Sequence, residues 1–468
     1  MITQSKQTMK RLPICDFQNH PSDATRHPYG IRKEDLYSLL SSKRKFSSIV
    51  INDSFGHSRA VLEKYLSIRG QSVLCLQINS NMQHWNLETT LKHLPNVEDL
   101  TINLDFVLSE KVTLRKLKSL KIFATSHGML HLIEAPKLVE LKLSGSYEDE
   151  RKINIIAFLM KSVKLQKLSV AQGLEIITLD GIENCTFKLK VLEMTGSIKK
   201  EEAQKVQRSL TRAEIFSKFL KQQEKSLTEI LIKTGNFDLI YKQILTRSDN
   251  LNCLSFDCSE LPQEESFYSN LKPLENIRTL KIITHDFERL EVAVAFHSLF
   301  PQIESLICRT QFIAPSYLNY LEIMADLHPN LKTLIILDFA AFCGNLRFKN
   351  LETLIFGEIN KAGLELILKH PTLENLSFGH PFSSLPTSSD IRRLQALPNL
   401  KTIEVRGTLH SVEKYYRICK NDYKNLSKAS FRIGYRDPMI IEIPTDRKYW
   451  STDIGKQYFK ELKSERRN

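Results

Sequence analysis

The sequence lacks any long hydrophobic run: nowhere in its 468 residues do about 18 consecutive apolar residues occur, the length a membrane-spanning helix requires. The first residues, MITQSKQTMKRL, are polar and contain no apolar stretch of the kind that defines a secretory signal peptide. We therefore expect a protein of the cytoplasm or the nucleus, with no membrane partner.

Closely spaced cysteine pairs are also missing. The eight cysteines are scattered, none forms Cys-x-x-Cys, and the nearest two are Cys253 and Cys258. Zinc sites need paired short spacings, and secreted disulfide frameworks are denser. The sequence thus predicts reduced, buried thiols and neither a metal nor a cofactor.

No catalytic motif is present. The sequence contains no Gly-x-Ser-x-Gly, no His-Glu-x-x-His, no phosphate-binding loop and no Gly-x-Gly-x-x-Gly after a strand. Histidines such as His131, His285 and His297 are dispersed, and we expect them at the surface or in helix caps. The sequence therefore predicts no catalytic residues and a protein that is not an enzyme.

An excess of charge of one sign is confined to the two ends. The chain has 66 Lys and Arg against 53 Asp and Glu, a net charge of +13. Residues 1–70 hold 12 basic against 6 acidic residues, and residues 411–468 hold 14 against 8, so the ends supply 12 of the 13 excess charges. Because both ends are of mixed sign and carry no regular aromatic spacing, we expect solvated surface and no nucleic-acid partner.

What the sequence does contain is a repeat, Φ-x-x-Φ-x-Φ, in which Φ is apolar. Successive copies start 20 to 28 residues apart, with one interval of 38. This period is typical of leucine-rich repeats. The copies are VLCLQI (73–78), VEDLTI (97–102), LKSLKI (117–122), LVELKL (138–143), LQKLSV (165–170), LKVLEM (189–194), LTEILI (227–232), LNCLSF (251–256), IRTLKI (277–282), IESLIC (303–308), LKTLII (331–336), LETLIF (351–356), LENLSF (373–378), LKTIEV (400–405) and a weaker LSKASF (426–431).

Each copy predicts one short strand followed by a helix. The last two Φ residues alternate, as a strand with one buried face requires. Helical spacing follows in residues 318–327 and 364–368, which end at His328-Pro329 and His370-Pro371. Units of this kind must stack to bury their apolar faces. The sequence therefore predicts an α/β leucine-rich-repeat solenoid, a horseshoe with strands on its concave side, over residues 71–431, and a C-terminal cap or tail over 432–468.

The 38-residue interval predicts an insertion near 196–213. An apolar helical stripe runs along it: Ala203, Val206, Leu210, Ala213 and Phe216. We expect the repeat's own helix at 214–222. The charged face of the insertion is either solvated or a docking surface.

The segment before the array resembles the second half of an F-box. Residues 32–54 contain Asp35-Leu36, a basic cluster at 43–45 and an apolar stripe with helical spacing. The stripe consists of Leu36, Leu39, Leu40, Phe46 and Ile49. Together with the repeats, this segment is similar to the F-box/leucine-rich-repeat family. The resemblance implies a helical module and N-terminal cap over 32–70, and a substrate-recognition subunit of a cullin-type ubiquitin ligase. The stripe would then bind the ligase's adaptor protein, while the repeats would bind a protein substrate destined for ubiquitin-dependent degradation.

The first half of the motif departs from that family. Leu12-Pro13 is followed by Pro21, Pro28 and Gly30, which would break the expected helix. We expect residues 1–31 to form a tail. The alternative function is a repeat scaffold or inhibitor that works without a ligase.

The pattern also predicts the residues of the concave face, because the residue between the last two Φ positions points there. Three adjacent repeats place Ile307, Ile335 and Ile355 at this position, with Leu337 beside them. A contiguous apolar patch of this kind is typical of a contact site. It is covered either by a partner or by the C-terminal segment, MIIEIP (439–444) with Tyr449, Trp450, Tyr458 and Phe459.

Overall fold

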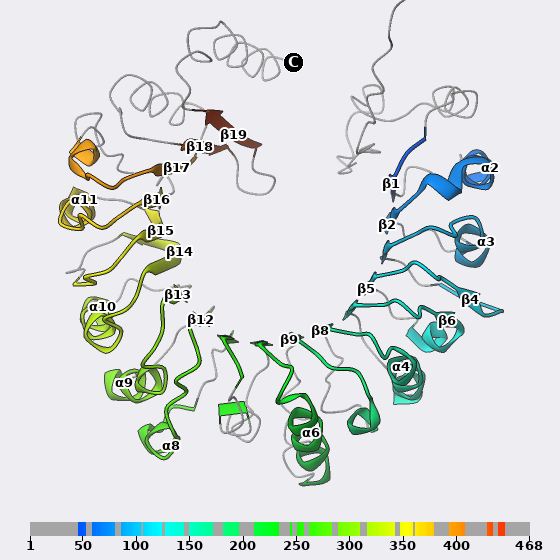
Figure 1. The fold of residues 1–468 in the computed structure, drawn as a ribbon, viewed down its shortest axis with the longest axis horizontal. Helices are drawn as coiled ribbons and strands as arrows, with labels where there is room; N and C mark the ends of the chain where they lie inside the picture. The colour runs from blue at the N-terminus through cyan, green and yellow to red at the C-terminus, as the bar shows by residue number, and fades with distance from the viewer. Residues whose placement is uncertain are drawn as a thin grey trace, which may run out of the picture. The chain divides into compact units, whose positions relative to one another are not determined.

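The structure is a computed structural model. It describes residues 45–52, 59–79, 86–103, 106–123, 127–144, 149–171, 181–195, 210–233, 244–245, 250–256, 262–282, 289–308, 316–341, 347–358, 361–378, 393–407, 428–433 and 439–444. The chain divides into two compact units, Met1–Asn250 and Leu251–Asn468. In each unit the strands lie along the inner edge and the helices along the outer edge (Figure 1).

Every copy of the repeat forms a strand that begins at its third residue. In the first unit each strand pairs in parallel with the next. These strands are β1 (Ser48–Asn52), β2 (Cys75–Asn79), β3 (Asp99–Ile102), β5 (Ser119–Phe123), β7 (Glu140–Ser144), β8 (Lys167–Ala171), β9 (Val191–Thr195) and β10 (Glu229–Lys233). The predicted α/β solenoid is thus confirmed in this unit.

The second unit repeats the arrangement. Its strands pair in parallel and in sequence order up to β18, which pairs antiparallel with β19. They are β11 (Cys253–Phe256), β12 (Thr279–Ile282), β13 (Ser305–Cys308), β14 (Thr333–Ala341), β15 (Thr353–Glu358), β16 (Asn375–Phe378), β17 (Thr402–Gly407), β18 (Lys428–Ile433) and β19 (Met439–Pro444).

Helices and short 3-10 turns return the chain from one strand to the next. In the first unit they are α2 (Arg59–Arg69), η2 (Gly70–Ser72), α3 (Leu87–Lys92), η3 (His127–Leu132), α4 (Asp149–Lys161), η5 (Ile182–Asn184) and α6 (Leu210–Gln223). A small parallel pair, β4 (Val112–Thr113) with β6 (Ile133–Glu134), lies among them. In the second unit they are α8 (Glu265–Ser269), α9 (Leu290–Ser298), α10 (Ser316–Leu327), α11 (Lys361–Ile367) and η6 (Leu394–Ala396). The helices predicted before His328 and His370 are therefore present.

The Φ residues lie in the core of the described repeats, together with helix residues such as Phe158. Leu117, Leu120 and Ile122 are 0% exposed, as are Leu331 and Leu334 in the other unit. A turn recurs before many of the strands: the backbone N–H of the first Φ donates to the carbonyl three residues upstream, for example Leu117 to Leu114 over 3.2 Å. The apolar pattern thus determines both the strand and its buried face. No helix in the described part of the chain is long and apolar enough to cross a membrane.

The array begins earlier than predicted. Phe46, Ile49 and Ile51 are buried, and they form another copy of the pattern, FSSIVI. Strand β1 pairs in register with β2 from Ser48 to Asn52. The prediction that Phe46 and Ile49 belong to one helical stripe, and the boundary at residue 71, are therefore wrong. Leu36, Leu39, Leu40 and the tail 1–31 lie outside the described residues.

At the other end, the sheet extends past the predicted boundary at 431. The weak copy LSKASF forms β18, and MIIEIP forms β19 beside it. These six residues therefore add a strand at the end of the sheet and do not cover its face. Tyr449, Trp450, Tyr458 and Phe459 lie outside the described residues.

Helix α6 differs from its prediction at the N-terminal end. It begins at Leu210 and ends at Gln223, so residues 210–213 belong to the repeat's helix and not to an insertion. Phe216 is buried, and the buried side chain of Gln223 accepts from the Leu189 N–H (2.9 Å) and donates to the Phe187 carbonyl (3.2 Å). The helix is thereby fastened to the segment before β9. Ala203 and Val206 lie outside the described residues.

Candidate interaction surface on the strand face

We call the side of the sheet opposite the buried Φ residues the strand face. The strand face of the first unit carries charges of both signs. Lys167 Nζ lies 3.0 Å from a Glu193 oxygen and 3.6 Å from a Glu140 oxygen, and Lys121 Nζ lies 4.0 Å from Asp99. Partial burial lowers the pKa of Lys167, but the carboxylates of Glu193 and Glu140 outweigh it, so the net pKa is raised. These charges are balanced within the face itself, which does not favour a polyanionic partner.

The strand face of the second unit is different. Pairing of β13 with β14 and of β14 with β15 places Ile307, Ile335 and Ile355 directly side by side. Each is half-buried, while the Φ residues on either side of it are fully buried. The adjacency predicted for the three isoleucines is thus what the register produces. Leu337 lies two residues beyond Ile335 in β14.

A row of short polar side chains runs beside the isoleucines. The residues two positions before them are Ser305, Thr333 and Thr353, and the row continues with Asn375 and Thr402. The Asn375 amide donates to Thr353 Oγ1 (3.1 Å), and Thr402 Oγ1 donates to Asn375 Oδ1 (2.6 Å). Since adjacent strands lie about 4.8 Å apart, the three isoleucines form an apolar stripe about 10 Å long with one polar border. We call Ile307, Ile335 and Ile355 the isoleucine stripe.

Metal-ligating clusters and cysteine thiols are the reactive groups that remain to be placed. Nowhere in the described ranges do three or more His, Cys, Asp or Glu side chains come together as metal ligands would. Burial raises the pKa of the Cys185 and Cys308 thiols to about 12, so neither is a nucleophile at neutral pH. Both thiols match the predicted buried state, whereas Cys75 is exposed on β2.

The histidine prediction fails at His297. This residue is 0% exposed in α9, and its Nδ1 lies 3.1 Å from Nε2 of His328, which is 1% exposed. His131 is half-buried in η3, and His285 lies outside the described residues. His328 takes the turn position, three residues before the first Φ, that is held by Leu94 and Leu397 in other repeats. Comparing this position across the repeats would have predicted from the sequence that His328 is buried.

Asparagines that precede the first Φ have a role the sequence reasoning missed. The side-chain amides of Asn96, Asn350 and Asn399 donate to carbonyls of the preceding repeat, those of Gln71 (2.7 Å), Pro329 (3.1 Å) and Pro371 (2.8 Å). Asn96 and Asn399 follow proline, whereas Asn350 follows Lys349. All three asparagines connect neighbouring repeats at the edge of the sheet.

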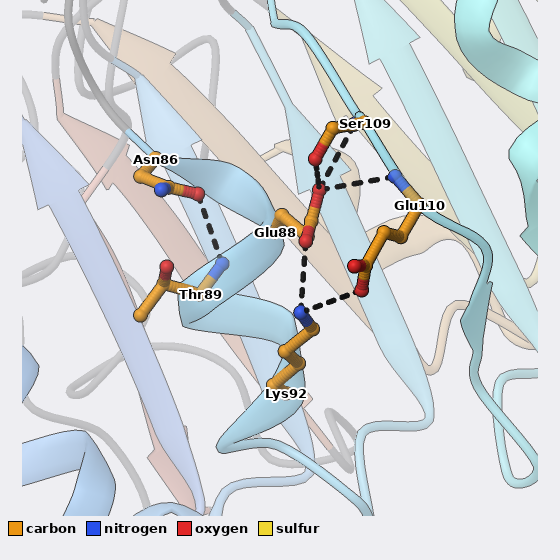
Figure 2. Close-up of polar contacts among 6 residues, drawn as sticks. All are labelled: Asn86, Glu88, Thr89, Lys92, Ser109 and Glu110. Atoms are coloured by element: carbon orange, nitrogen blue, oxygen red, sulfur yellow. Dashed lines mark hydrogen bonds and ion pairs between the residues drawn. The ribbon is translucent and has the colours of Figure 1, made fainter.

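A polar cluster on the outer side of the first unit serves the fold (Figure 2). Asn86 caps α3 by accepting from the Thr89 N–H (3.0 Å). Glu88 accepts from Lys92 Nζ (2.8 Å) and from the Ser109 N–H (2.9 Å) and hydroxyl (2.7 Å). These bonds, that of Lys92 foremost, lower the pKa of Glu88 to about 2. Because its oxygens are already bonded to the loop after β3, Glu88 fastens α3 to that loop.

These features define an α/β solenoid of leucine-rich repeats. No protein-family model and no curated protein matches the chain. Among solved structures, it is similar to the leucine-rich-repeat-containing protein LegL7 from Legionella pneumophila, with 14% identity, 65% of this chain and 94% of that chain covered, and a TM-score of 0.37. It is also similar to TLR13 in the TLR13–ssRNA13 complex, with 11% identity, 84% and 74% coverage and a TM-score of 0.33. The repeat assignment itself rests on the strand register and core of this chain.

Proposed function

We propose that the protein is a non-enzymatic binding scaffold that holds a protein partner on the strand face of its second unit. The isoleucine stripe is the observation that carries this proposal. Three aliphatic side chains stand in register on a face whose neighbouring positions are polar, as at Lys281 and Ser377. Apolar stripes with a polar border are typical of the centre of protein–protein interfaces.

The variant Ile335→Asp tests the proposal, because Ile335 lies in the middle of the stripe and its side chain is only half-buried. Its matched control is Thr101→Asp, which changes the equivalent half-buried position of β3 in the first unit. Partners captured by the wild-type chain are compared quantitatively across the three proteins, alongside their melting temperatures. We expect at least one partner protein that wild type and Thr101→Asp capture equally. Ile335→Asp should capture at least 10-fold less of it, with an unchanged melting temperature.

Equal capture by all three proteins contradicts this function. If Ile335→Asp unfolds the chain, Ile307→Ser and Ile355→Ser replace it, since a hydroxyl is already tolerated at Ser377 in the same row. If these folded variants capture as much partner as the wild type, the proposed function is likewise contradicted.

A finer candidate is the substrate receptor of a cullin-type ubiquitin ligase, supported by the F-box resemblance of residues 32–54. Phe46 and Ile49 are buried in the array, so we assign adaptor binding in this candidate to Leu36, Leu39 and Leu40 alone. Co-purification with the adaptor protein, comparing wild type with Leu36→Asp/Leu39→Asp, is its test. Absence of the adaptor from the wild-type complex removes this candidate and leaves the scaffold function in place.

A further inference from the structure

A groove lies on the helix side of the second unit, away from the strand face. It lies between α8 and α9, which are neighbours along the outer edge (Figure 1), and has a volume of about 500 Å³. This volume lies within the range of ligand-binding pockets in proteins. We call it the α8–α9 groove.

Apolar side chains form the walls of the α8–α9 groove. They are Leu271, Leu290, Val294 and Ala295, all half-buried. At its base lies Tyr268, 1% exposed, whose hydroxyl donates to the Pro262 carbonyl (2.8 Å) and whose ring packs edge-on against Phe296 (5.5 Å). The base is therefore held in place by the core.

Two carboxylates are the charged groups of the groove. Glu265 and Glu291 line it and are exposed, and among the described residues no Lys or Arg lines it. Within the described residues neither makes an ion pair, whereas Glu88, Glu193 and Glu304 each pair with a lysine. The lining hydroxyls of Ser269 and Ser298 donate to their own helices, at 3.0 Å and 2.7 Å. Glu265 and Glu291 are thus the polar groups left for an incoming ligand.

This combination defines the chemistry of an occupant. An apolar lining favours a large apolar side chain, and an acidic rim favours positive charge next to it. The acidic rim stands out on a chain whose net charge is +13. We propose that the α8–α9 groove docks a short segment of a partner protein in which one large apolar side chain stands beside lysine or arginine. This site lies on the helix side, and so is independent of the isoleucine stripe.

The experiment measures binding of a fluorescein-labelled Lys-Lys-Trp-Lys peptide to the full chain by fluorescence anisotropy. The test variant is Glu265→Gln/Glu291→Gln. The matched control is Glu264→Gln/Glu275→Gln, which neutralises two exposed carboxylates of the same region that do not line the groove. We expect a dissociation constant raised at least 10-fold in the test variant, unchanged in the control, and rising with salt in the wild type.

Three results overturn the proposal. One is equal affinity of wild type and test variant for the peptide. Another is equally tight binding of a Ser-Ser-Trp-Ser peptide, which would make the groove a purely apolar site. The last is a 10-fold gain in affinity when residues 445–468 are removed, because the chain's own basic end would then be the occupant. Val294→Ser separates groove binding from surface attraction: we expect it to weaken binding at least 5-fold with both carboxylates intact.

Discussion

The paired histidines of the second unit show how one residue can carry a pH response within a repeat. His328 stands where some other repeats place leucine, and its imidazole reaches His297 in the neighbouring helix. Burial lowers the pKa of His328 from 6.5 to about 4. The folded protein therefore holds this imidazole neutral under conditions in which the unfolded chain protonates it.

The difference between the folded and unfolded pKa of His328 makes the free energy of unfolding fall as the pH falls. Because the folded-state pKa is depressed, the stabilisation is complete above pH 6.5 and is lost progressively as the pH falls towards about 4. Between pH 7.5 and pH 5 the free energy of unfolding of the wild type should fall by about 2 kcal/mol from this group. In His328→Leu that fall should be absent, although the variant loses about 1–3 kcal/mol at pH 7.5 because the contact between His297 Nδ1 and His328 Nε2 is lost.

Urea unfolding at the two pH values measures the effect. The His328→Leu stability curve should be flatter with pH than that of the wild type. Parallel curves for wild type and His328→Leu would show that the buried pair does not titrate in this range.

At the scale of the element, neighbouring repeats are held together by close backbone contact as well as by side chains. Gly70 in η2 is buried, and a Cβ placed there would lie 2.1 Å from the carbonyl oxygen of His93, just after α3. The obstacle is main chain, so it cannot turn aside as a flexible side chain would. Glycine at this position allows the first helical turns of the array to pack at their observed separation.

We therefore expect Gly70→Ala to lower the free energy of unfolding by about 1–3 kcal/mol, the range of overpacking in a close-packed interior. Chemical denaturation is the measurement, and Gln71→Ala, at an exposed side chain next to it, is the control. A stability within about 0.3 kcal/mol of the wild type would mean that α2 and α3 move apart without cost.

At the scale of the whole molecule, stability in a repeat array is expected to be local, because each repeat contacts its neighbours in sequence. Leu334 of β14 is 0% exposed, and its truncation in Leu334→Ala should cost about 2–5 kcal/mol. Loss of hydrogen-exchange protection should then spread to β13 and β15, while β3 and β5 of the first unit keep theirs.

Hydrogen exchange read by mass spectrometry gives this map, and Leu120→Ala in β5 is the reciprocal control. Its effect should be confined to the first unit. Equal loss of protection in both units from either variant would mean that the chain unfolds as one cooperative body.

Much of the site followed from the sequence, because a period-2 alternation within a copy assigns each side chain to one face of the sheet. Equal positions in successive copies then come into register, which is how Ile307, Ile335 and Ile355 are found side by side. The same logic failed at Phe46 and Ile49. Two apolar residues three apart fit a helix as well as the start of a repeat. The buried Ile51, two residues further on, completes the repeat pattern and distinguishes the strand from a helix.

The amino-acid sequence by itself therefore determined the repeat, its strands and the residues of its strand face, since these depend on local periodicity. The tertiary structure decided what depends on the packing of irregular segments between strands. It brought His297 against His328, bonded the Asn350 amide to the preceding repeat, and turned β19 antiparallel at the end of the sheet. The α8–α9 groove belongs to this second group, because two helices from different repeats form it and no short pattern records their separation.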